Sequence, residues 1–136
     1  PNRLWVADIT YVRVRAEFVY LAVLLDVFTR RIRGWHLGRS LDQSLTRTAL
    51  DRAFRRGTPA IHHSDQGVQY AATGYVERLV GRGVAVSMAA VGQPEENGYA
   101  ERLMRTIKEE EVALTEYADL ADARRQLGQF LDAVYN

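Results

Sequence analysis

The chain has 136 residues, of which 47% are hydrophobic and 26% are charged, and it contains no cysteine. This length and hydrophobic content predict one folded domain with a substantial core and exclude a disordered chain. The absence of cysteine excludes a disulfide framework and thiolate metal sites. The formal net charge is only +1, so a surface for nucleic acid must be local rather than global. The longest apolar run, residues 18–25, is too short for a bilayer span, and no export leader opens the chain. We therefore expect a cytoplasmic protein without a membrane partner.

Three strands are predicted in the first forty residues, because β-branched and aromatic residues are frequent there and turn residues separate them. They run over residues 4–15, 18–26 and 32–37. The second of these is apolar on both faces, which predicts a strand inside the sheet. A helix capped by Ser40 or Asp42 follows and continues to Arg56, before a Gly-Thr-Pro turn.

Short strands and helices alternate in the remaining chain. We expect a strand at 60–63, a helix at 75–82, a strand at 84–87, a helix from Asn97 to about Leu114 and a helix from Asp119 onwards. Three strands in sequence, followed by helix, strand, helix, strand and helix, predict the α/β class with a five-stranded mixed sheet flanked by helices. The first strand would be central in this sheet. Residues 89–96 are predicted to form a mobile loop that covers the candidate site described below.

The two ends of the chain indicate that residues 1–136 are a single domain excised from a longer protein. The chain begins with Pro-Asn-Arg at the edge of a strand, and it stops at Val134-Tyr135-Asn136 within a helical pattern. We expect further segments on either side.

Three acidic residues stand in sequence contexts that indicate chemistry. Asp8 lies inside an apolar run, where a carboxylate without a cationic partner would be costly. Asp65 leaves the carboxyl end of the fourth strand, and Glu101 lies in the first turn of the long helix, with 35 residues between them. The carboxyl edge of a sheet is where α/β proteins gather their chemistry, so the three acids can meet there. Each acid alone also has a structural interpretation: a buried ion pair, a turn residue or an acid at a helix start.

A cluster of carboxylates predicts a site for a hard divalent cation. Oxygen ligands without any cysteine favour Mg²⁺ or Mn²⁺ over zinc. Two such ions, held by Asp8, Asp65 and Glu101, would suit the cleavage of a phosphodiester, because one ion can lie beside each reacting oxygen.

The long helix carries a candidate face for DNA. At 100° per residue, Asn97, Arg105 and Lys108 all fall within about 40° of Glu101, while Leu103 lies on the opposite side. Basic side chains beside a metal site can hold phosphates. Pairing of Glu101 with Arg105 along the helix is the alternative interpretation.

Five motifs occur in an order typical of one family. They are Trp5-x-x-Asp8-Ile9-Thr10-Tyr11, Tyr20-Leu21-Ala22 through Asp26-Val27-Phe28-Thr29-Arg30-Arg31, His63-Ser64-Asp65-x-Gly67-x-Gln69-Tyr70, Ser87-Met88, and Glu96-Asn97-x-x-Ala100-Glu101. With them the chain resembles the catalytic core of transposases of the insertion-sequence-3 kind, within the retroviral-integrase superfamily of ribonuclease-H-like folds. The chain departs from the family pattern in two motifs: Gln66 stands where the family often has Arg, and Glu96-Asn97-Gly98 stands where it commonly has Asp-Asn-Ala.

The resemblance implies a DDE transposase core that cleaves DNA strands and transfers them, with two Mg²⁺ or Mn²⁺ ions as cofactors. Element ends and target DNA would be its partners, in a homo-oligomer. It also implies a DNA contact for Lys108, because related integrases carry a DNA-contacting base at the matching position. The family's N-terminal helix-turn-helix region has no counterpart in this sequence. A ribonuclease-H-like nuclease without strand transfer, and a domesticated non-catalytic DNA-binding module, remain the alternatives.

Several other residues have structural interpretations that we prefer. His62 and His63 flank the site and could shuttle protons or orient ligands, but histidines at strand ends are more often structural. Asp26 is best explained as the cap of the following turn. Trp5, Trp35 and Tyr70 are expected in the core, since aromatic residues in strands usually pack.

Overall fold

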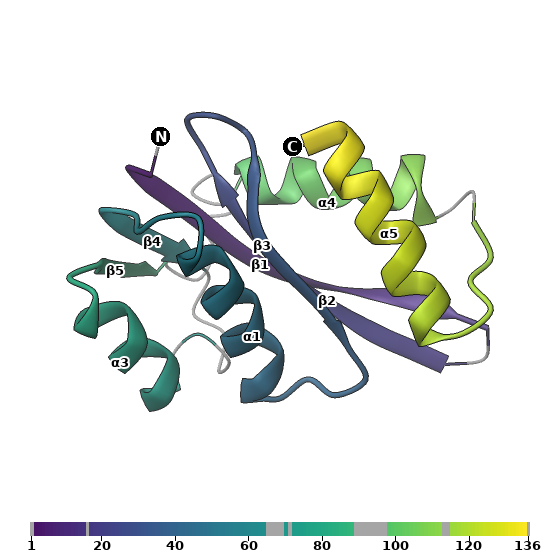
Figure 1. Cartoon of the computed structure of the whole chain (residues 1–136), viewed down its shortest axis with the longest axis horizontal. Coiled ribbons are helices and arrows are strands. Elements are labelled where there is room, and N and C mark those ends of the chain that lie inside the picture. Colours follow the sequence, from purple (N-terminus) through teal and green to yellow (C-terminus); the bar gives the residue numbers. More distant parts are fainter. Residues whose placement is uncertain are drawn as a thin grey trace.

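A five-stranded mixed sheet forms the centre of the molecule, in the order β3-β2-β1-β4-β5 (Figure 1). This computed structural model describes residues 2–15, 17–64, 70, 72–88, 98–112 and 115–135. The strands are β1 (Leu4–Val14), β2 (Glu17–Asp26), β3 (Ile32–Gly38), β4 (Ile61–Ser64) and β5 (Ala85–Met88). β1 pairs antiparallel with β2 and parallel with β4, so it is the central strand, as the sequence predicted. The predicted five-stranded mixed sheet is therefore confirmed.

Helices cover both faces of this sheet (Figure 1). They are α1 (Gln43–Phe54), α3 (Thr73–Gly81), α4 (Gly98–Glu110) and α5 (Leu120–Tyr135). Asp42 caps α1, since its side chain accepts a hydrogen bond from the backbone N–H of Ser44, as expected of an N-cap acid. α4 ends at Glu110, earlier than the predicted Leu114, which lies outside the described residues together with 89–97. None of the helices in the described part of the chain is long and apolar enough to cross a membrane.

Two hydrophobic cores form, one on each face of the sheet. α1 and α3 pack on one face, and α4 and α5 on the other. β2 contributes to both cores, with Leu21 and Val23 in one and Ala22 and Leu24 in the other. This alternation explains why the β2 sequence is apolar throughout, because an interior strand buries both of its faces. Trp5 and Tyr70 are also buried, as predicted.

β3 is held between α1 and α5 at two points of close contact. A Cβ atom on Gly34 would lie 2.7 Å from the backbone N of Ala53, so α1 can lie directly on β3 only because this position has no side chain. On the other face, a Cβ on Gly128 of α5 would lie 3.0 Å from the Trp35 ring. The two glycines therefore fix how closely the helices approach this edge strand.

The turn between β2 and β3 is organised by Asp26. Its carboxylate accepts hydrogen bonds from the backbone N–H groups of Phe28, Thr29 and Asn2. Burial acts to raise the pKa of Asp26, but these backbone hydrogen bonds outweigh burial and hold it below the usual value. The interpretation of Asp26 as a turn cap is confirmed.

Candidate functional site

Asp8 lies half-buried on the central strand. The backbone N–H of Ile9 donates a hydrogen bond to its Oδ1, at 2.9 Å. β4 pairs with β1 through Leu4, Trp5 and Val6, so Asp8 comes two residues after the last paired position. β1 and β4 therefore run in parallel, and Asp8 lies just beyond their paired region.

The second predicted acid follows directly after β4. This strand ends at Ser64, and Asp65 is the next residue in the sequence, outside the described residues. Asn97, predicted for DNA, also lies outside them. The position of these two side chains remains a prediction, although the strand that leads to Asp65 has the predicted parallel partner.

Glu101 lies in the first turn of α4, with an exposed side chain. α4 packs against β1, so the helix of Glu101 contacts the strand of Asp8. Leu103 is buried in the core, as predicted, and Arg105 is exposed. The helix therefore turns an apolar face to the sheet and leaves Glu101 and Arg105 at the surface.

Lys108 makes a contact that the sequence analysis missed. Its ammonium nitrogen lies 4.6 Å from the centre of the Tyr11 ring, within the range of a cation–π interaction. Tyr11 lies on β1, three residues after Asp8, and it is 56% exposed. Its ring also meets Phe18 edge to face, with ring centres 5.3 Å apart. The exposure of Tyr11 and its nearness to α4 come from the fold, so no pattern in the sequence pointed to this contact.

The two histidines of β4 have protein partners. His62 is buried, and its Nε2 shares a hydrogen bond of 2.6 Å with the Tyr75 hydroxyl. Burial lowers the pKa of His62 to about 4. The Nδ1 of His63 shares a hydrogen bond of 2.8 Å with the Ser87 hydroxyl of β5. These contacts agree with the structural interpretation of His62, which is part of the core of the sheet.

The described donors suit a hard cation, but they do not make a complete site by themselves. Within the described ranges, no group of three histidine, aspartate or glutamate side chains could hold a metal ion. Asp8 and Glu101 supply carboxylate oxygens, the ligand type that Mg²⁺ and Mn²⁺ prefer. A third ligand would have to come from Asp65, which lies outside the described residues. The donor set therefore fits the predicted cation.

Comparison with known proteins gives matches over the whole length of the chain. A family model described as integrase core domain matches residues 1–94, and a second model of the same description matches residues 82–136. The transposase for insertion sequence element IS904 of Lactococcus lactis subsp. lactis (strain IL1403) is 32% identical, over 100% of this chain and 55% of its own length. This chain spans about half the length of the first curated relatives that it matches.

Solved structures share the fold. The simian T-cell lymphotropic virus intasome, determined in complex with a PP2A regulatory subunit, aligns with a TM-score of 0.74 and 22% identity, over 79% of this chain and 39% of that chain. The integrase catalytic core of HTLV-2, in complex with magnesium and in a trimeric form, aligns with a TM-score of 0.68 and 21% identity, over 79% of this chain and 68% of that chain. These likenesses confirm the ribonuclease-H-like fold. The family match, over more than half of the sequence, shows that the chain belongs to the integrase core domain family.

Proposed function

We propose that the chain is the catalytic core of a DDE transposase, which cleaves DNA strands and joins the freed ends to target DNA. The observation that carries this proposal is the packing of α4 against β1, which brings the helix of Glu101 to the strand of Asp8. The family match and the transposase relative support the same activity.

The catalytic residues would be Asp8, Asp65 and Glu101. Their role would be to hold the metal ions and, through them, to orient the reacting groups. Three carboxylates from two strands and a helix give a fixed set of oxygen donors, and that set would align the scissile phosphate with its nucleophile. Bound Mg²⁺ or Mn²⁺, two ions in the active complex, would supply charge stabilisation at the attacking and leaving oxygens and lower the pKa of the attacking hydroxyl or water. The magnesium named with the HTLV-2 core supports this choice of ion.

The DNA would lie along the exposed face of α4. Arg105 is exposed and Lys108 is half-buried on this helix, and both would bind backbone phosphates next to the scissile bond, together with Asn97. Element ends and target DNA would be the partners, and the protein would act as a homo-oligomer on cellular DNA in the cytoplasm. We also propose that residues 1–136 work as one domain of a longer protein, in agreement with the length of the curated relatives.

The test removes one carboxylate charge at a time. Asp8→Asn, Asp65→Asn and Glu101→Gln each preserve side-chain volume, so each should abolish strand transfer of a preprocessed DNA end while thermal melting shows an intact fold. Because the residues act as a unit, double variants should be no worse than single ones. Glu109→Gln, an exposed acid of the same helix, is the matched control and should retain activity.

Two outcomes would contradict the proposal. Full strand transfer by any of the three variants would remove that residue from the catalytic set. Metal-dependent cleavage by the natural sequence without any strand transfer, in the protein at its natural length, would instead identify a nuclease.

A further inference from the structure

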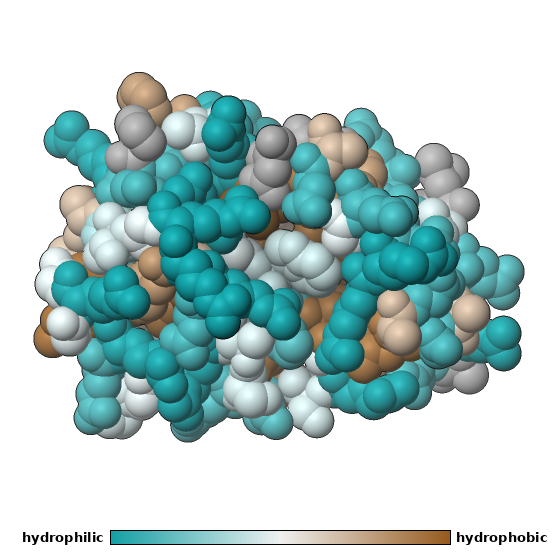
Figure 2. Space-filling view, in the orientation of Figure 1, coloured by the Kyte–Doolittle hydropathy of each residue, from teal (hydrophilic) through white to brown (hydrophobic). Residues whose placement is uncertain are grey.

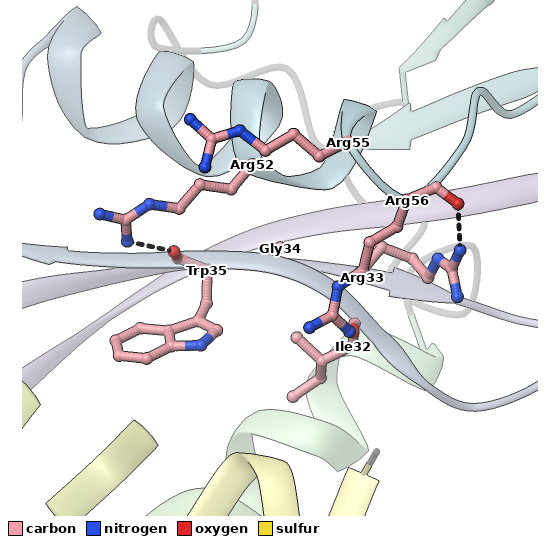
Figure 3. Close-up of a pocket in the computed structure, with 7 residues that line it drawn as sticks. All are labelled: Ile32, Arg33, Gly34, Trp35, Arg52, Arg55 and Arg56. Atoms are coloured by element: carbon pink, nitrogen blue, oxygen red, sulfur yellow. Dashed lines mark hydrogen bonds between the residues drawn. The ribbon is translucent and has the colours of Figure 1, made fainter. Parts of the chain in front are cut away.

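Arginine side chains line a pocket at the edge of the sheet, where the C-terminal end of α1 meets β3 (Figure 3). The pocket has a volume of about 270 Å³. Its lining residues are Ile32, Arg33, Gly34, Trp35, Arg52, Arg55 and Arg56. Figure 3 shows Arg52 and Arg55 extending from α1 in the same direction, and the Arg56 side chain beside Ile32. This pocket was not predicted, because its arginines come from two separate segments of the sequence.

Positive charge is concentrated in these two segments. Residues 27–39 and 52–64 together contain seven arginines and no aspartate or glutamate, although the whole chain has a net charge of only +1. Figure 2 shows hydrophilic side chains gathered over the C-terminal end of α1 and the adjoining part of β3. Arg39, at the end of the first segment, pairs with Glu17, so the unbalanced positive charge lies at the pocket itself.

The arginines of the pocket have neutral partners. Arg52 donates a hydrogen bond to the backbone oxygen of Trp35 at 3.0 Å, and Arg33 donates one to the backbone oxygen of Arg56 at 2.6 Å. Arg56 donates a longer one, 3.4 Å, to the oxygen of Ile32. Carbonyl groups orient a guanidinium without neutralising it. Among the residues that the structure describes, no carboxylate forms an ion pair with the four arginines, Arg33, Arg52, Arg55 and Arg56.

Two further observations concern the surroundings of this pocket. The buried Nε of Arg33 has no hydrogen-bond partner within the described part of the chain, which leaves a donor unsatisfied. On the same strand, burial first, and then the charges of Arg52 and Arg124, lower the pKa of His36. Other arginines differ, because Arg78 pairs with Asp51 and Arg125 pairs with Asp122.

A purely structural role explains part of this arrangement. Arg52 and Arg56 satisfy carbonyl oxygens of an edge strand, and basic residues at the end of α1 complement its dipole. Neither role accounts for Arg55, which is exposed, or for the unsatisfied Nε of Arg33. Four neighbouring cations without an acid repel one another, and an anion in the pocket would relieve that repulsion.

We propose that this pocket binds a phosphate group of the DNA backbone. The proposal rests on the proposed function for the identity of the ligand, and it adds a second contact to the one on α4. α1 and α4 lie on opposite faces of the sheet, so the DNA segment held here differs from the segment at Glu101. An exposed guanidinium such as that of Arg55 can give two parallel hydrogen bonds to phosphate oxygens. A phosphate contact gives no sequence specificity, but it would fix the position of the duplex on the protein.

Duplex binding at several salt concentrations tests this assignment. A labelled DNA duplex is titrated with the protein, in EDTA so that binding is separate from catalysis. Arg55→Ala should lower affinity several-fold and reduce the slope of log affinity against log salt by about one unit, the effect of one lost phosphate contact. Arg55→Lys keeps the charge and should restore most of the slope. Arg125→Ala, which makes the same change in net charge on α5, is the matched control and should leave the slope unchanged.

Inorganic phosphate provides the second arm of the experiment. Phosphate should compete with the duplex for the natural sequence and compete less for Arg55→Ala. An unchanged salt slope in Arg55→Ala, with an intact melting transition, would overturn the proposal, even if free phosphate stabilised the protein against heat. Loss of strand transfer in every protein tested, with the Arg55 effect on the slope retained, would overturn the proposed catalysis and leave the pocket as a DNA contact.

Discussion

The Lys108 ammonium lies 4.6 Å from the centre of the Tyr11 ring, so its charge is already in contact with the protein. A cation–π contact at a partly exposed site contributes about 0.5–1 kcal/mol to stability. The same contact restricts the conformations of the long Lys108 side chain. It therefore reduces the loss of side-chain entropy when Lys108 binds a phosphate. Lys108 can thus serve the fold and the DNA at once, and a single substitution would confuse the two roles.

Two variants separate them. Lys108→Ala should lower both the thermal stability and the salt slope of DNA binding, the slope by about one unit. Tyr11→Leu keeps the ammonium and removes the ring, so stability should fall while the slope stays near that of the natural sequence. Calorimetric melting and the salt titration of duplex affinity measure the two effects. If Lys108→Ala changes only the melting temperature, the basic side chain belongs to the helix surface and the DNA must run elsewhere.

Individual residues were predictable where their role depends on nearby sequence. Asp26 as a turn cap and Asp42 as a helix cap follow from local sequence, and both are found. The Lys108–Tyr11 contact joins residues 97 positions apart, so no local pattern could indicate it. The arginine pocket could not be predicted either, because it depends on how closely α1 approaches β3.

At the scale of elements, the strands and helices were predicted nearly to their ends. β1 stops at Val14, one residue before the predicted end, and Arg15 has a positive φ of 53° that begins the turn. The central place of β1 and the inner place of β2 also followed from the sequence, the latter because β2 is apolar on both faces, whereas the position of β5 at the sheet edge was not predicted. What could not be predicted is the distance between helix and strand, which depends on packing.

The packing of α1 on β3 depends on Gly34. Replacing it with alanine would place a Cβ 2.7 Å from the backbone N of Ala53 and even nearer to the oxygen of Ala49, so the helix must move. We expect Gly34→Ala to destabilise the fold by about 1–3 kcal/mol, the usual cost of overpacking. It should also alter the arginine pocket, whose wall is the same helix.

Urea unfolding measures this effect. Gly81→Ala is the matched control, because nothing lies within 4 Å of its added Cβ and the residue ends α3. Alanine there should be neutral or slightly stabilising. Equal unfolding free energies for Gly34→Ala and the natural sequence would show that α1 does not rest on β3 as described.

At the scale of the whole molecule, one sheet with a core on each face unites all the described elements. His62 lies within this structure, on a strand paired on both sides, and its buried position explains why its pKa falls to about 4. The sequence predicted that His62 lies at the end of a strand. It did not predict that the Tyr70 and Tyr75 rings would pack around it. Burial in the centre of the fold makes the stability of the whole domain depend on the protonation of this histidine.

The unfolded chain has an ordinary histidine pKa of 6.5, and the folded one has about 4, so the unfolded state binds a proton first on acidification. The stabilising contribution is therefore complete above pH 6.5 and is lost as the pH falls towards 4. The shift corresponds to about 3 kcal/mol. The lowered pKa of His36, caused by burial and by Arg52 and Arg124, acts in the same direction.

Three aspartates with lowered pKa values act below this range. Hydrogen bonds from Ser44 to Asp42 and from Ala118 to Asp122 hold the pKa of both carboxyls below 3.8, and Asp26 behaves in the same way. Their contributions are lost only at lower pH. The difference between the natural sequence and a His62 variant, measured between pH 6.5 and 4.5, therefore isolates the contribution of this histidine.

His62→Gln should remove most of this pH dependence, because glutamine has no charge to gain and can still meet the Tyr75 hydroxyl. The free energy of unfolding in urea, measured at pH 7.5 and at pH 4.5, gives the comparison. The natural sequence should lose about 2–3 kcal/mol more than the variant over this interval. If both lose the same amount, His62 is already accessible to protons in the folded state, and the core around β4 would have to be open to water at that strand.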